Sequence, residues 1–187
     1  NKLEILLKQI LKNHPEINCL VSNAGYGDFG PLENFSIFQI NNFIATNLSS
    51  HMVITKLLLP HFKKVKLGNL IFIGSEAGLL GAKNGSLYCA AKFGLRGFTQ
   101  ALSKDVANKN IRVSIINSGM VRTDFFENLN FEPGIDKQNA ISVEDANESF
   151  EMFKEELCYV SPTFDWDDSS TWISENCPIV MNKGSVV

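Results

Sequence analysis

The sequence predicts an α/β fold with a parallel sheet, and two observations lead to this prediction. Three short apolar runs, Ile17 to Val21, Asn69 to Ile73 and Ile111 to Ile116, are bounded by polar residues or glycine and are too short for buried helices. Two long segments with helical periodicity, Ser36 to Lys64 and Ser86 to Asn108, lie between them. Because apolar strands that alternate with helices form βαβ units, we expect the three runs to pair in parallel and to be buried on both faces.

The helical segments have recognisable ends. The opening residues, Asn1 to Asn13, place their leucines and isoleucines on one stripe of a helix, which indicates an amphipathic helix packed on a core. Ser36, preceded by Phe35, is predicted to cap the first long helix at its N-terminus. Pro60 is expected to kink or end that helix before the basic patch that follows it.

The last third of the chain has a less regular pattern. An aromatic-rich segment, Phe125 to Phe131, precedes a turn at Pro133-Gly134. We expect a helix from about Val143 to Leu157 and an edge strand at Cys177 to Met181. The whole chain, residues 1–187, is predicted to be a single domain, because its length and its 44% hydrophobic content suit one core.

Composition and charge argue against several classes of function. The formal net charge of -3, without a long Lys/Arg run, offers no attraction for nucleic acid, so no nucleic-acid partner is expected. No apolar stretch is long enough to span a bilayer and the charged first helix is unlike a signal peptide, so we expect a cytoplasmic protein. The four cysteines are widely spaced and are expected to be reduced. The histidines are scattered and no C-x-x-C occurs, so no metal site is expected.

Polar residues follow each of the three predicted strands. In an open parallel sheet, ligands bind beyond the carboxyl ends of the strands, so these residues are the first candidates for a functional site. They are Asn23-Ala24-Gly25, Gly74-Ser75 and Asn117-Ser118-Gly119. Tyr88 and Lys92 lie four residues apart near the start of the second long helix, and therefore on one face of it. A tyrosine has an ordinary pKa of about 10, and a neighbouring cation favours its phenolate, which suits acid-base catalysis nearer neutral pH.

Together these residues resemble the short-chain dehydrogenase/reductase family. The resemblance rests on ordered elements at characteristic spacings: Asn23-Ala24-Gly25 after a strand, Asn47 in the next helix, Ser75 after the following strand, and Tyr88-x-x-x-Lys92. The offset of 22 residues from Gly25 to Asn47 fits the family, and so does the offset of 13 residues from Ser75 to Tyr88. The clear resemblance covers about Ile17 to Asp124.

The resemblance implies an NAD- or NADP-dependent oxidoreductase that interconverts an alcohol and a carbonyl compound. It implies that Tyr88 exchanges a proton with the substrate oxygen and that Ser75 hydrogen-bonds the same oxygen. Lys92 would bind the nicotinamide ribose and lower the pKa of Tyr88. Asn47 would hold a water in the proton relay, and Thr123 would contact the carboxamide of the nicotinamide. The implied catalytic residues are Asn47, Ser75, Tyr88 and Lys92, and the implied cofactor-binding residues are Asn23, Ala24, Gly25, Tyr88, Lys92 and Thr123.

The resemblance also implies a Rossmann-like, doubly wound parallel sheet that lacks its first βαβ portion. The family's Gly-rich turn and first strand would precede Ile17, where the chain has one helix. The segment Gly25 to Gly30 matches G-x-G-x-x-G, but Pro31 and Glu33 follow where a helix should open, so it is not expected to replace that turn. The chain alone is therefore expected to bind NAD or NADP weakly. Where the family has Pro-Gly after the strand, this chain has Ser118-Gly119.

The sequence also gives expectations about substrates and partners. The segment Phe125 to Phe131 lies where the family covers its active site, and its aromatic residues favour hydrophobic alcohols or ketones. The two long helices carry more apolar residues than one face needs, so we expect a homodimer or homotetramer. Two alternatives stay open. One is a sugar-nucleotide epimerase or dehydratase, although the part after Lys92 is short for it; the other is a catalytically silent fragment that acts only as a binding or oligomerisation module.

Overall fold

The computed structural model of the protein describes residues 2–127, 129, 140, 142 and 143. The chain divides into two units, Asn1–Asn117 and Ser118–Val187, and each is described by itself. The predicted turn at Pro133-Gly134 and the predicted strand Cys177 to Met181 lie outside the described residues. So does the predicted helix from Val143 to Leu157, apart from its first residue. That the chain forms one domain stays a prediction.

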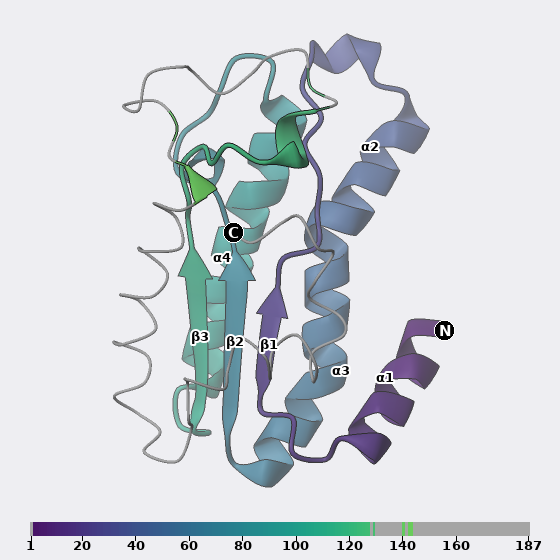
Figure 1. The fold of residues 1–187 in the computed structure, drawn as a ribbon, viewed down its shortest axis with the longest axis vertical. Coiled ribbons are helices and arrows are strands. Elements are labelled where there is room, and N and C mark those ends of the chain that lie inside the picture. Colours follow the sequence, from purple (N-terminus) through teal and green to yellow (C-terminus); the bar gives the residue numbers. More distant parts are fainter. Residues whose placement is uncertain (1, 128, 130–139, 141, 144–187) are drawn as a thin grey trace. The chain divides into compact units, whose positions relative to one another are not determined.

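Three parallel strands form the sheet of the first unit (Figure 1). They are β1 (Cys19–Ser22), β2 (Gly68–Ile73) and β3 (Ile111–Ile116), and they lie in the order β1-β2-β3. Leu20 pairs with Leu70, which also pairs with Val113, so side chains of one face line up across the sheet. The predicted α/β fold with a parallel sheet is therefore confirmed.

The helices of the first unit connect the strands and pack on the sheet. α1 (Lys2–Asn13) precedes β1, α2 (Ile37–Ile44) and α3 (Ser50–Val65) connect β1 to β2, and α4 (Ser86–Val106) connects β2 to β3. Apolar side chains from α1, α3, α4 and the sheet form one core: Leu7, Leu20, Leu58, Phe62, Leu70, Phe72, Leu95, Leu102, Val106 and Ile111. Each large apolar side chain buried in this way stabilises the fold by about 1.5–3 kcal/mol.

The first long helix begins as predicted. Ser36 caps α2: its hydroxyl oxygen accepts a hydrogen bond from the Gln39 N–H at 3.2 Å. The Gln39 side chain accepts in return from the Ser36 N–H at 2.9 Å, and the two bonds together form a capping box. The helix then widens into a π-helical turn at Ala45–Ser49 before it continues as α3.

Pro60 does not end this helix. α3 passes through Pro60 and continues to Val65, and its C-cap is Lys66, whose φ of 56° is left-handed. A proline inside a helix removes one backbone hydrogen bond. On either side of it, Leu58 and Phe62 are 4% and 0% exposed, and their packing in the core offsets that loss.

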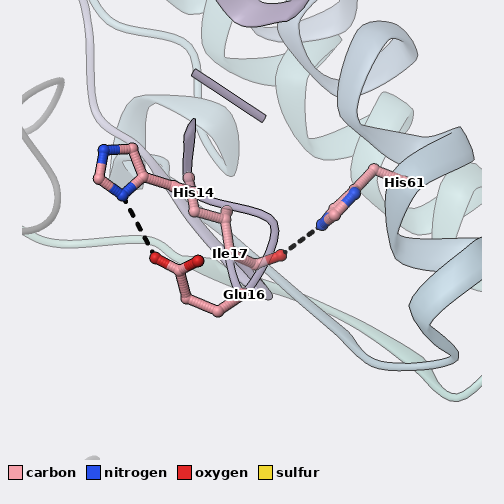
Figure 2. A network of polar contacts seen from close by, with 4 residues as sticks. All are labelled: His14, Glu16, Ile17 and His61. Atoms are coloured by element: carbon pink, nitrogen blue, oxygen red, sulfur yellow. Dashed lines mark hydrogen bonds and ion pairs between the residues drawn. The ribbon is translucent and has the colours of Figure 1, made fainter. Parts of the chain in front are cut away.

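His61, on α3, fixes the connection between α1 and β1 (Figure 2). Its Nε2 donates a hydrogen bond to the carbonyl oxygen of Ile17 at 2.9 Å. The Ile17 N–H donates to the His14 carbonyl at 3.3 Å, so Ile17 belongs to a turn. For this reason β1 begins at Cys19 and not at Ile17 as predicted. His14 and Glu16 pair on the surface at 3.2 Å, and an exposed pair of this kind contributes little to stability.

The second unit contains a short 3-10 helix, Asp124–Phe126. In the described part of the chain no helix is both long enough and apolar enough to cross a membrane. Cys89 is a free thiol, while Cys158 and Cys177 lie outside the described residues.

Candidate active site

The carboxyl ends of the three strands meet at one edge of the sheet. The register pairs Ile73 with Ile116 and pairs Ser22 with the residue before Ile73, so the strands end nearly level with one another. The segments that follow β1 and β2 therefore lie at the same edge, and they contain Asn23-Ala24-Gly25 and Ser75. This edge is where open α/β sheets bind ligands.

Asn47 holds the turn that follows β1. It lies in the π-helical turn and is 1% exposed. Its Oδ1 accepts from the Tyr26 N–H at 3.0 Å, and its Nδ2 donates to the Phe43 carbonyl at 3.2 Å. A Cβ on Gly25 would lie 2.6 Å from Asn47 Oδ1, which is closer than real atoms approach, so only glycine fits there without a shift. The structure thus brings Asn23-Ala24-Gly25 and Asn47 together.

The side chains of Ser75 and Tyr88 are close enough for the Ser75 hydroxyl to lower the pKa of Tyr88. Ser75 follows β2, and its Oγ also accepts from the Ala77 N–H at 3.2 Å, which fixes its position. Tyr88 lies in the first turn of α4 and is 8% exposed. Its ring packs on those of Phe29 and Phe43, with centroid distances of 5.0 and 6.4 Å. Two hydroxyls placed in this way can both reach one oxygen atom of a bound molecule.

Burial raises the pKa of Tyr88, because a buried phenolate is poorly solvated. The Ser75 hydroxyl opposes this shift by favouring the phenolate, while Cys89 and Glu76 add to it. From the sequence, Lys92 is expected to lower this pKa. In the structure burial dominates, and the phenol keeps its proton at neutral pH.

Lys92 lies one helical turn after Tyr88 and is 7% exposed. Its Nζ donates to the carbonyl oxygen of Ile73 at 3.0 Å and lies 5.7 Å from the centroid of the Tyr88 ring. Burial lowers the pKa of Lys92 to about 8, so the group still carries its charge at neutral pH. Because Ile73 is the last residue of β2, its carbonyl holds the charged Nζ of Lys92 at the carboxyl edge of the sheet.

Thr123 belongs to the second unit. Its Oγ1 accepts from the Phe125 N–H at 3.3 Å, so it caps the 3-10 helix Asp124–Phe126. In the described part of the chain, no group of three or more His, Cys, Asp and Glu side chains is arranged to hold a metal ion.

Comparison with known proteins identifies the family. Residues 1–133 match the family model described as short chain dehydrogenase. The chain belongs to the short-chain dehydrogenase family. It is 36% identical to human retinol dehydrogenase 8, over 59% of this chain and 35% of that protein. It is 35% identical to the 3-oxoacyl-(acyl-carrier-protein) reductase FabG of Haemophilus influenzae, over 70% of this chain and 54% of that protein.

A solved structure supports the same assignment. The chain resembles a metagenomic short-chain oxidoreductase in complex with NADP, with a TM-score of 0.60 and 30% identity. The similarity covers 62% of this chain and 53% of that chain. The chain thus spans about half the length of several relatives it matches, and less of retinol dehydrogenase 8. The Rossmann-like fold predicted from the resemblance is confirmed.

Sequence reasoning missed one buried pair of polar residues. Ser22 ends β1 and is 5% exposed, and His51, near the start of α3, is 1% exposed. Ser22 Oγ and His51 Nδ1 are 2.6 Å apart and hydrogen-bonded. Burial lowers the pKa of His51 to about 4, and the charge of Lys92 lowers it as well. The only signal in the sequence is a histidine four residues after Asn47, on the same side of the helix.

The shifted pKa of His51 makes stability depend on pH. Between its ordinary pKa of 6.5 and its folded pKa of about 4, the unfolded chain binds a proton that the native chain does not. The free energy of unfolding should therefore fall as the pH is lowered through this window, with His51 contributing roughly 3 kcal/mol. Urea unfolding of the wild type and of His51→Gln at pH 7 and pH 4.5 measures this contribution. Equal losses in both proteins would show that His51 is not the group that titrates.

Proposed function

We propose that this chain carries the acid-base site of an NAD- or NADP-dependent oxidoreductase that interconverts an alcohol and a carbonyl compound. The observation that supports this most directly is that Ser75 interacts with Tyr88, while Lys92 Nζ, one helical turn away, lies 5.7 Å from the centroid of the Tyr88 ring. All three come from separate positions in the sequence and meet at the carboxyl edge of the sheet, where the fold binds ligands. The relatives named as a retinol dehydrogenase and a 3-oxoacyl reductase agree with this reaction class.

Tyr88 is proposed as the group that exchanges a proton with the substrate oxygen. Because burial raises its pKa, it holds its proton at neutral pH and can donate it to a carbonyl oxygen. Ser75 donates a second hydrogen bond to that oxygen and so stabilises the negative charge that develops there. In the reverse direction, Tyr88 as the phenolate accepts the alcohol proton and becomes the phenol again. The nicotinamide, when bound, supplies or takes the hydride at the substrate carbon.

The residues at the sheet edge fit a dinucleotide. Ala24 and Gly25 are exposed, and the absence of a side chain on Gly25 lets a ligand approach the backbone closely. Asn23, Ala24 and Gly25 are proposed to line the cofactor, and Lys92 Nζ to donate to its nicotinamide ribose. Asn47 is proposed to hold a water of the proton relay. Thr123 is proposed to contact the carboxamide.

The substrate is proposed to be a hydrophobic alcohol or ketone. In the first unit, Leu79 and Leu80 follow Ser75 closely along the chain and are 42% and 75% exposed. In the second unit, the rings of Phe125 and Phe126 pack edge to face at 5.2 Å, and Phe125 is 37% exposed. Phe131 lies outside the described residues. In each unit by itself, exposed apolar side chains close in sequence to a candidate site residue favour apolar substrates.

Self-association through α3 and α4 is also proposed, although fewer apolar residues are exposed on these helices than the sequence indicates. Most of the apolar residues on these helices lie in the core or pack against it. Val53 and Val65 on α3 and Phe93 on α4 are exposed instead, at 36%, 42% and 42%. Exposed apolar side chains on two long helices suit an isologous contact between two copies of the chain.

The catalytic role of Tyr88 is tested by Tyr88→Phe in the full-length protein. The ring packing stays and only the phenolic proton is lost, so kcat should fall about 10²–10⁴-fold while the dissociation constant for NADPH changes less than about twofold. Lys92→Met should weaken cofactor binding as well, since it removes a ribose contact together with the buried charge. Fluorescence titration and steady-state kinetics provide both numbers.

A wild-type kcat in Tyr88→Phe would contradict the assignment. If the wild-type full-length protein bound NADPH or NADH but turned over no alcohol or ketone, the silent binding module would be the better description.

Substrate preference can be measured with a matched series of ketones of increasing chain length. Each added methylene that is buried on binding should lower KM, by about threefold to fourfold if it contributes about 0.8 kcal/mol. Leu80→Ser should flatten this dependence without affecting the NADPH titration. A preference for small polar carbonyl compounds would count against the proposal.

The proposed association predicts a mass of two or four chains in light scattering at micromolar concentration. Phe93→Glu places a charge in the proposed contact and should shift the mass to that of one chain. Phe38→Glu is a suitable control, because Phe38 on α2 is 73% exposed and lies outside the proposed contact. A monomeric wild type would exclude the association.

A further inference from the structure

The buried pair of Ser22 and His51 has no part in the proton chemistry proposed above, yet it lies directly below the turn that follows β1. Ser22 is the last residue of β1 and immediately precedes Asn23-Ala24-Gly25. The hydrogen bond of 2.6 Å to His51 Nδ1 ties this end of the turn to α3. Burying a polar pair between a strand and a helix costs free energy, because both groups lose their contacts with water. Such groups are therefore found buried where they hydrogen-bond to each other.

The ring of His51 is held in one orientation. One of its sides faces Phe72, with ring centroids 6.4 Å apart at an interplanar angle of 65°. If the Ser22 hydroxyl donates to Nδ1, the ring proton must be on Nε2. In the described part of the chain Nε2 has no partner at hydrogen-bonding geometry, and the Ala24 backbone near the ring offsets only a small part of the fall in its pKa. His51 thus interacts with the residue before the turn and with a residue inside it.

Asn47 holds the other end of the same turn. Its Oδ1 accepts from the Tyr26 N–H, one residue after Gly25. Asn47 and His51 are four residues apart in one continuous helical run, so they act from the same side of it. The three residues between Ser22 and Tyr26 are therefore fixed at both ends by a single helical segment.

We propose that His51 is a positioning residue that, through Ser22, sets the geometry of the Asn23-Ala24-Gly25 turn and with it the affinity for the dinucleotide. The part of this proposal that concerns the dinucleotide rests on the proposed function. The part that concerns the turn rests on the contacts of Ser22 and His51 alone.

Two substitutions at His51 separate the two ring nitrogens. His51→Asn keeps a polar atom at the place of Nδ1, where Ser22 binds, whereas His51→Gln keeps one at the place of Nε2. His51→Gln should raise KM for NADPH about 10-fold with kcat changed less than about twofold, and His51→Asn should restore most of the wild-type KM. Ser22→Ala removes the same bond from the strand side and should match His51→Gln.

Hydrogen exchange tests the turn without any need for activity. The Tyr26 amide, which is bonded to Asn47, should exchange about 10-fold faster in His51→Gln and in Ser22→Ala than in the wild type or in His51→Asn. Thr55→Val is the matched control. Thr55 is 2% exposed and lies one helical turn after His51, but its Oγ1 bonds only back to the His51 carbonyl at 2.7 Å. The control should affect thermal stability and leave both the Tyr26 exchange and the NADPH KM unchanged.

The results of these experiments decide whether His51 positions the turn. Equal effects of His51→Asn and His51→Gln, or a Thr55→Val variant that loosens the turn as much as they do, would overturn the proposal. Unchanged Tyr26 exchange in His51→Gln would overturn it too. Faster exchange in a protein that binds no dinucleotide would support the positioning role and refute the proposed function.

Discussion

Parallel pairing in register determines where every other group of the first unit lies. Because β1, β2 and β3 end nearly level, the polar residues after β1 and β2 emerge at the same edge of the sheet. The pairing also fixes which side chains face the helices. A slip of β1 by one residue would turn Leu20 out of the core and would move Ser22 away from His51. The apolar contacts between Leu20, Leu70 and Leu58 thus stabilise the fold and also hold the site in place.

Burial shifts the pKa values of Tyr88 and Lys92, the candidate acid-base pair, in opposite directions. It raises the pKa of Tyr88 and lowers that of Lys92 to about 8, because it disfavours the charged form of each group. Both side chains nevertheless keep their protons at neutral pH. Tyr88 is therefore neutral beside a buried cation, which is the state needed to donate a proton, and the carbonyl of Ile73 supplies part of the solvation that Lys92 loses.

Much of this arrangement could be predicted from the sequence, and the exceptions have physical causes. The three strands, the N-cap at Ser36 and the positions of Ser75, Tyr88 and Lys92 follow from local patterns and spacing. The start of β1 was mispredicted because His61, distant in sequence, binds the Ile17 carbonyl and holds that residue in a turn. Pro60 was expected to kink or end the helix; it does not end it, because tertiary packing on both of its sides outweighs the lost backbone bond. The Ser22–His51 bond joins residues 29 positions apart, so no local pattern reveals it.

A row of buried polar side chains on one helical run needs a reason, because leucine at the same positions would bury more apolar surface. Asn47, His51 and Thr55 recur at intervals of four residues and are 1%, 1% and 2% exposed. Thr55 bonds to its own helix, so it costs little and constrains nothing outside it. Asn47 and His51 instead bond to the segment that follows β1, at Tyr26 and Ser22. Their bonds are directional, whereas apolar packing would let the turn shift by fractions of an ångström, and a backbone that lies against a ligand must be placed more accurately than that.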